Sequence, residues 1–332
     1  MRIFSFKKVS CLSSYPFLIF ALCALSCTRA NDWKSASGSV WGTTYHIIYN
    51  SDRDLSDSIV SVTSLISESL SMFDRNSTVS RINRGETDSV DAFFADVYGL
   101  SQAVYAASRG KFDPTVAPLV DLWGFGRSGK DVSAPDSAAV ARTLEYVGLS
   151  RSTLDGNRIL KDDPRLEFDF SAVAKGYGVD KVAAMLNRNG CSDYMVEIGG
   201  EIRLAGHNPR GRDWRIQIDA PVQGSNPGDS ALSVLTLTDC AVATSGNYRN
   251  FRQLAGDSII GHTIDPLTGM PSPQKVLSAT VIAPDCALAD ALATALMASE
   301  PAGAQEIINP FPGVKAFITL PSGKSVTFSS EK

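Results

Sequence analysis

Apolar residues recur every three or four positions in several stretches of this chain, a spacing typical of helices that bury one face. The clearest run extends from Leu55 to Leu70, with Ser51 and Asp52 before it as candidate caps. Gly110 follows another such run and is suited to end a helix. The spacing predicts helices over residues 55–70, 93–108, 135–147, 174–189 and 286–299.

Runs rich in β-branched and aromatic residues predict strands between these helices. They follow one another without the regular strand-helix alternation of a doubly wound parallel sheet, so the predicted fold class is α+β. We interpret residues 111–130 as a loop, rich in Gly and Pro around two aromatic residues, and residues 244–248 as a second loop. The predicted strands cover residues 39–49, 157–161, 166–170, 194–198, 201–205, 214–219, 232–237, 258–264 and 276–283.

The N-terminus has the features of an export signal. Arg2, Lys7 and Lys8 precede an uncharged run that extends to residue 27. The sequence Ala24-Leu25-Ser26 before Cys27 resembles a bacterial lipoprotein cleavage box, so Cys27 is the predicted lipidated residue. We therefore expect a signal peptide over residues 1–27, a mature domain over 28–332, and lipid anchoring to a bacterial membrane facing the periplasm. A simple cleaved signal and an uncleaved anchor are the alternatives.

Composition and charge exclude some classes of partner. The 332-residue chain has a formal net charge of −4 and no basic block, which argues against a nucleic-acid partner. Three of the six cysteines, namely Cys191, Cys240 and Cys286, lie beyond residue 27. Three thiols cannot all pair with one another, so the sequence predicts no disulfide framework.

The pair Asp290 and Thr294 is a candidate metal site. The two residues are four positions apart in an apolar helical run, so their oxygens lie on one helix face. A carboxylate and a hydroxyl are oxygen ligands of the kind that Mg²⁺ takes. The alternative is that Asp290 caps or flanks the helix while Thr294 bonds back to the preceding turn.

Residues 169–178 are a candidate phosphate site, because they join a predicted strand to a helix and include Lys175. Backbone groups and a cation at such a junction can hold phosphate. The segment lacks the spacing of a P-loop, and the chain has no Rossmann glycine motif. The alternative is a tight turn with a solvated Lys175. Gly199-Gly200, between two predicted strands, allows either close approach to a ligand or a hairpin.

His262 and Asp265 are candidates for proton transfer, since they flank a predicted strand end that enters a Pro/Gly turn. The alternative for His262 is a turn histidine bonded to a backbone carbonyl. The scattered histidines and cysteines have no zinc spacing, and no Gly-x-Ser-x-Gly motif is present. The sequence therefore does not support nucleophilic catalysis by the protein itself.

Taken in order, these segments resemble the ApbE family, the FAD:protein FMN transferases, across nearly the whole mature chain. Each match is weak alone, and their joint occurrence in this order is specific. The matching segments are Gly42-Thr43, Ser77 to Asn83, Phe112-Asp113-Pro114-Thr115, Leu122-Trp123-Gly124-Phe125-Gly126, Asp169 to Tyr177, Ile198-Gly199-Gly200, Thr244-Ser245-Gly246, His262 to Gly269, and Ala289-Asp290 through Thr294.

The resemblance implies a T-fold-related α+β architecture of two intimately packed subdomains, with FAD bound as substrate. It implies a Mg²⁺ ion held by Asp290, Thr294 and the carbonyl of Ala172. Within the matching pattern, Glu201 stands where the glycine pair is commonly followed by Asp, and Phe73 stands where many members have Tyr. The FAD contacts that the resemblance implies are Trp41, Phe73, Leu122, Trp123, Gly124, Asp169, Lys175, His262, Thr263 and Ile264.

The implied reaction moves FMN from FAD to a protein. The hydroxyl of an acceptor Thr or Ser attacks the phosphorus on the FMN side, AMP leaves, and Mg²⁺ offsets the charge that builds up. In this interpretation His262, helped by Asp265, is the base that takes the hydroxyl proton. The expected acceptors are exported flavoproteins such as subunits of membrane NADH:quinone oxidoreductase or related electron-transfer complexes. A Mg²⁺-dependent FAD pyrophosphatase and a non-catalytic FAD-binding lipoprotein are the alternative functions.

Overall fold

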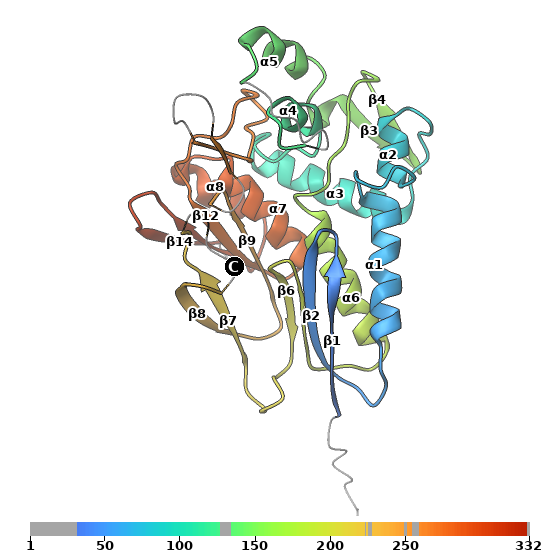
Figure 1. Ribbon diagram of the computed structural model, residues 1–332, viewed down its shortest axis with the longest axis vertical. Coiled ribbons are helices and arrows are strands. Elements are labelled where there is room, and N and C mark those ends of the chain that lie inside the picture. Colours follow the sequence, from blue (N-terminus) through green and yellow to red (C-terminus); the bar gives the residue numbers. More distant parts are fainter. Residues whose placement is uncertain are drawn as a thin grey trace, which may run out of the picture. The chain divides into compact units, whose positions relative to one another are not determined.

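An antiparallel sheet of eight strands is the centre of the computed structural model, which describes residues 32–126, 134–222, 224, 228–248, 251–253 and 259–330 (Figure 1). Every neighbouring pair in the sheet is antiparallel. The strands, in their order across the sheet, are β1 (Trp33–Val40), β2 (Thr43–Asn50), β5 (Tyr194–Ile198), β6 (Glu201–Ala205), β9 (Ala241–Gly246), β12 (Ser278–Ala283), β13 (Lys315–Thr319) and β14 (Ser325–Ser329).

The other strands form three separate pairs, and the helices lie between strands in the chain. The pairs are β3 (Ser152–Asp155) with β4 (Arg158–Lys161), β7 (Trp214–Asp219) with β8 (Ala231–Leu237), and β10 (Phe251–Gln253) with β11 (Ile259–Gly261). The α-helices are α1 (Ser56–Leu70), α2 (Thr78–Asn83), α3 (Ala92–Ala107), α4 (Ala117–Leu122), α5 (Ser137–Leu144), α6 (Ala174–Arg188), α7 (Cys286–Met297) and α8 (Ala304–Ile308).

Helices α6 and α7 position the candidate site. They pack against each other, and α7 also packs on β9 and β12 in the middle of the sheet (Figure 1). Helix α7 is rich in Ala and Leu on every side, which is typical of a helix buried all round, and 11 of its 12 residues are buried. Its polar exceptions, Asp290 and Thr294, are therefore held in place by the core around them.

The structure confirms the predicted α+β class and most of the predicted elements. The predicted strand over 39–49 is two strands, because Trp41 and Gly42 form the turn between β1 and β2 with positive φ angles. The predicted strand over 166–170 is wrong. There the Asn83 amide side chain bonds the backbone N–H and C=O of Phe168, so the segment is fixed without a sheet partner.

Three further segments differ from the predictions in the type or length of their secondary structure. Residues 244–246 belong to β9 and not to a loop, since they pair with β12 in the central sheet. The predicted strand over 258–264 is shortened to β11, and the predicted loop over 111–130 contains helix α4.

Residues Asp32–Lys332 form one compact unit. Among the residues that the structure describes, no helix is both long and apolar enough to cross a membrane. The predicted signal peptide, including Cys27, lies outside the described residues.

Candidate active site

The first turn of α6 meets the middle of α7, and a glycine allows this approach. The backbone N–H of Gly176 donates to Asp290 Oδ2 at 3.1 Å. A Cβ atom at Gly176 would lie 2.4 Å from the carbonyl oxygen of Cys286, which is closer than real Cβ contacts. The contact therefore places the start of α6, including Lys175, directly beside the Asp290 carboxylate.

Lys175 lies between two buried carboxylates. Its ammonium is 3.0 Å from Glu201 Oε1 and 3.8 Å from Asp290 Oδ2, and Glu201 and Asp290 are only 4% and 2% exposed. Burial raises the pKa of Glu201 to about 7, opposed by the Lys175 ammonium. Burial also disfavours the charged Lys175, but the two carboxylates outweigh it and hold its pKa above the ordinary value.

The charge balance of this cluster fits a hard cation. Two carboxylates face one ammonium, and Glu201 Oε2 is buried without a hydrogen-bond partner in the structure. Buried charge without compensation is costly, so a divalent cation with oxygen ligands would stabilise the cluster. Within the described part of the chain, no group of three or more His, Cys, Asp or Glu residues gathers as a metal site. The predicted set contains only one such residue, Asp290.

Thr294 continues the cluster along α7. Its hydroxyl oxygen lies 3.3 Å from Ser245 Oγ on β9, and one turn of helix separates it from Asp290. Asp290 and Thr294 thus share a helix face as their spacing predicts, and the structure adds Lys175 beside Asp290. Ala172 lies just before α6 and packs against the core that contains α7.

The turn between β1 and β2 lies over α6. The indole N–H of Trp41 donates to Ser67 Oγ on α1 at 2.8 Å. Gly178 has no side chain under this ring, and a Cβ there would lie 2.1 Å from Trp41 Cη2. Trp41 is thereby fixed beside the first turns of the helix that carries Lys175.

Two loops approach the segment before α6. Met72 Sδ accepts a long hydrogen bond from Ser171 Oγ at 3.9 Å, and the next residue, Phe73, is 75% exposed. The backbone N–H of Asp169 donates to the carbonyl of Pro114, and its carboxylate accepts from the N–H of Ser171. Phe73 thus presents a large apolar ring to the outside, while Asp169 shapes the turn that leads into α6.

A third group of predicted residues surrounds the turn after His262. The Trp123 indole N–H donates to the carbonyl of Gly269 at 2.7 Å, which joins the Leu122-Trp123-Gly124 loop to this turn. The His262 ring meets the Phe125 ring edge to face, with centroids 6.4 Å apart. Thr263 donates to Asn247 Oδ1 through its hydroxyl, and Ile264 is buried in a cluster with Trp123.

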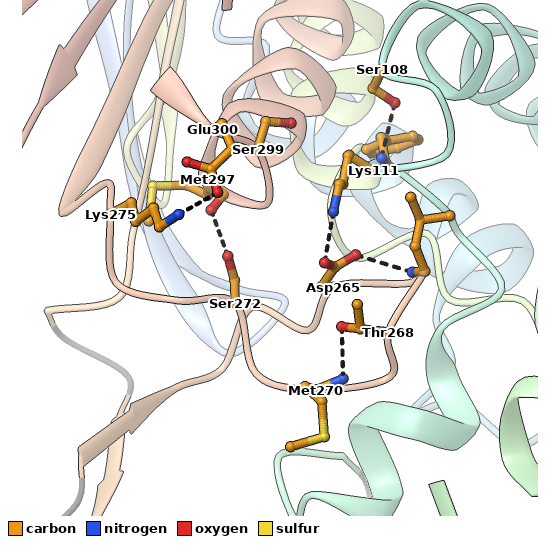
Figure 2. Close-up of polar contacts among 12 residues, drawn as sticks. Ser108, Lys111, Asp265, Thr268, Met270, Ser272, Lys275, Met297, Ser299 and Glu300 are labelled. Atoms are coloured by element: carbon orange, nitrogen blue, oxygen red, sulfur yellow. Dashed lines mark hydrogen bonds and ion pairs between the residues drawn. The ribbon is translucent and has the colours of Figure 1, made fainter. Parts of the chain in front are cut away.

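The Asp265 carboxylate is bonded to a lysine side chain and to a backbone N–H. Lys111 Nζ is 2.6 Å from its Oδ2 atom, and its Oδ1 atom accepts from the N–H of Leu267 (Figure 2). Sequence reasoning did not identify Lys111 as part of the site, because no local motif connects residues 154 positions apart. The same holds for Glu201 as the partner of Lys175.

Helix α7 connects the groups of predicted residues. Its middle carries Asp290 and Thr294, and the carbonyl of Met297 at its end accepts from Ser272 Oγ on the chain that follows the His262 turn (Figure 2). The contacts thus join the cluster around Lys175 and the turn around His262 to one rigid element.

Fold and site together define an α+β protein with a buried cluster of Lys175, Glu201 and Asp290 where α6 meets α7. Residues 41–318 match the model of the ApbE family, and the chain belongs to that family.

Individual relatives agree with this assignment. The chain is 37% identical to a FAD:protein FMN transferase of Vibrio cholerae over 280 residues, which are 82% of this chain and 83% of that protein. It is 33% identical to the protein of the same name from Haemophilus influenzae, over 86% of each chain.

Solved structures show the same fold. The flavin transferase ApbE of Vibrio cholerae superposes with a TM-score of 0.78 at 35% identity and covers 90% of this chain and 98% of its own. The apo form of the Pseudomonas stutzeri flavinyl transferase ApbE gives a TM-score of 0.79 at 30% identity, covering 90% and 95%.

Proposed function

We propose that this chain is an FAD:protein FMN transferase, which moves FMN from FAD to a Thr or Ser hydroxyl of an acceptor protein and releases AMP. Family membership supports the reaction, because the relatives named above carry this name and align over most of their length. Within the site, the main support is the cluster in which Lys175, at the start of α6, faces Glu201 and Asp290.

The residues of this cluster suit a pyrophosphate. The Lys175 ammonium stays protonated because two carboxylates face it, so it can offset negative charge on phosphate oxygens. Asp290, Thr294 and the carbonyl of Ala172 would hold Mg²⁺, with Glu201 nearby. When bound, Mg²⁺ neutralises the charge that develops on the phosphate oxygens as the bond to AMP breaks.

His262 is the proposed base for the acceptor hydroxyl. A neutral imidazole can take a proton near neutral pH, and the turn that carries His262 is held by Asn247, Trp123 and Lys111. Phe73 and Trp41 are proposed to contact the flavin or adenine ring, since their rings lie on the two loops that border α6.

The test follows AMP release and acceptor mass together. The chain lacking residues 1–27 is mixed with FAD, Mg²⁺ and a candidate acceptor domain, and an acceptor heavier by FMN on Thr or Ser is expected. Free FMN with AMP and an unlabelled acceptor would instead indicate a pyrophosphatase, and FAD that binds without cleavage would indicate a carrier. Either result, with every acceptor domain tried, would contradict the transferase.

A matched pair of variants tests the metal assignment. Asp290→Ala should lower turnover by at least about 100-fold, because a buried ligand and the N–H partner of Gly176 are lost together. Asp285→Ala, at the exposed start of the same helix, should retain turnover. Normal turnover in Asp290→Ala at limiting Mg²⁺ would exclude this residue as the ligand.

We further propose that the protein is exported and anchored by a lipid on Cys27. The charged start, the uncharged run and the residues before Cys27 support this proposal. The acceptors would then be exported flavoprotein subunits, such as those of membrane NADH:quinone oxidoreductases or related electron-transfer complexes.

A further inference from the structure

Asp265 uses every polar group it has to hold the turn after His262. Its backbone N–H donates to the carbonyl of Met270, and its carbonyl accepts from the N–H of Gly269. Its Oδ1 atom accepts from the N–H of Leu267. These three bonds close the turn over residues 265–270, and the chain then runs back antiparallel to Ile264 at Pro271.

The remaining carboxylate oxygen of Asp265 is bonded to Lys111 from a distant segment. The distance between Nζ and Oδ2 is 2.6 Å, and the side chains are 27% and 9% exposed. Lys111 lies in the segment that leads from α3 to the Phe112-Asp113-Pro114 motif (Figure 2). A charged hydrogen bond with little water around it is strong and directional, so it fixes the turn relative to α3.

Three further bonds between described residues surround the turn. All three are neutral: Trp123 to Gly269, Thr263 to Asn247, and Ser272 to the end of α7. His262 lies three residues before Asp265, on the short segment that connects β11 to this turn. A shift of the turn would therefore move the imidazole relative to the cluster on α7.

We propose that Lys111 is a positioning residue for the transfer reaction, acting through Asp265 to hold the His262 turn in its working position. The inference rests on the proposed function and on His262 as the base. It assigns to Asp265 the role of an anchor for the turn, distinct from the role of assisting the base directly.

Kinetics of three single variants test the proposal. Lys111→Met should lower kcat by about 10- to 100-fold, because misplacing a catalytic group by about 1 Å costs that much. Lys111→Arg, which keeps the charge, should restore kcat to within about threefold of the wild type. The matched control is Lys275→Met, because Lys275 pairs with Glu300 at 2.5 Å on the same segment but both side chains are more than half exposed. This control should leave kcat unchanged.

A double variant separates positioning from stability. Lys111→Met alone leaves Asp265 buried without a countercharge, which lowers the melting temperature. The variant that combines it with Asp265→Asn removes that charge and should regain much of the melting temperature while kcat stays low. If kcat returns together with the melting temperature, the pair is only structural and the proposal is wrong.

Histidine NMR tests the proposal without turnover. The chain has only three histidines, so ring signals labelled with ¹³C can be assigned by single substitutions. Lys111→Met should shift or broaden the His262 signal while those of His46 and His207 stay unchanged. An unchanged His262 signal together with wild-type kcat would overturn the proposal. If the wild type transfers no FMN at all, the proposed function fails, and the His262 signal still decides whether Lys111 holds the turn.

Discussion

Gly176 lies where the backbones of α6 and α7 come into close contact, and its missing side chain has a measurable consequence. Gly176→Ala would drive a methyl group into the carbonyl of Cys286. Such overpacking costs about 1–3 kcal/mol, and it also separates the N–H of residue 176 from Asp290. We expect a lower free energy of unfolding by urea denaturation and weaker FAD binding by fluorescence titration.

The matched control for this prediction is Gly99→Ala on α3. Gly99 is exposed, and no atom lies within 4 Å of its would-be Cβ. Replacing an exposed glycine inside a helix with alanine should raise stability by about 0.5–1 kcal/mol. If both substitutions change stability by the same amount, the close approach of the two helices does not explain the effect at Gly176.

At this scale, residue spacing predicted part of the site. Asp290 and Thr294 share a helix face because helical geometry is local, and the structure places Lys175 beside Asp290. The binding roles of these three residues stay predictions. Glu201 and Lys111 were missed as ion-pair partners because their partners are distant in the chain. The spacing of residues along the chain does not predict which distant charged side chains the folded protein places next to each other. The catalytic role of Asp265 remains a prediction, and its observed partner is Lys111.

Among the elements, α7 depends on α6 for its N-terminal cap. Asp285, the residue before α7, makes no capping bond with its side chain. The N–H groups of Cys286 and Ala287 instead donate to the carboxylate of Asp180 on α6. Unsatisfied N–H groups at a helix start are costly when buried, so this bond stabilises the joint between the two helices that carry the site.

The Asp180 carboxyl predicts a pH dependence of stability. Burial raises its pKa from 3.8 to about 6. The folded state therefore holds more protons than the unfolded state between about pH 4 and 6, and the free energy of unfolding falls as pH rises through that interval. The contribution is about 3 kcal/mol at most.

Asp180→Asn tests this dependence because it removes the titration. Measured by urea denaturation without metal, the stability of the wild type relative to Asp180→Asn should decrease from pH 4 to pH 6. Asp163→Asn is the control, because the Arg165 side chain lowers the pKa of Asp163 to about 2, below the interval. A difference between wild type and Asp180→Asn that stays constant with pH would contradict the assignment.

Helices were easier to predict than strands. The spacing of apolar residues within a helix is enough to predict it. The predicted bounds of α1, α3, α6 and α7 agree with the structure to within a few residues. The segment 166–170 has strand-like composition, but the amide of Asn83 occupies the backbone groups of Phe168. Residues 244–246 look like a loop by composition and are nevertheless a central strand, because β12 pairs with them.

For the whole molecule, the sequence predicted the class but not the order of the strands. The sheet joins strands far apart in the chain, such as β6 with β9 and β9 with β12. Those pairings depend on the burial of two faces at once and have no local pattern. The resemblance to the ApbE family, in contrast, covered most of the chain. The match of the family model to residues 41–318 confirms it.

Attachment to a membrane belongs to this scale as well. If Cys27 carries the lipid, Cys27→Ala should move the protein from the membrane fraction to the soluble fraction while flavin transfer in solution is retained. A lipid-specific mass shift on Cys27 in the wild type is the second expected result. Membrane association that persists unchanged in Cys27→Ala would exclude this anchor.

Helix α7 also sets the distance between two parts of the site. Asp290 and Met297 are seven residues apart on one buried helix, so about 10 Å along its axis separates the metal candidate from the point where the His262 segment is tied. Loops on either side can vary without altering that interval. A one-residue insertion within α7 would rotate everything beyond it by about 100°, so this buried helix should tolerate insertions less well than the loops on either side of it.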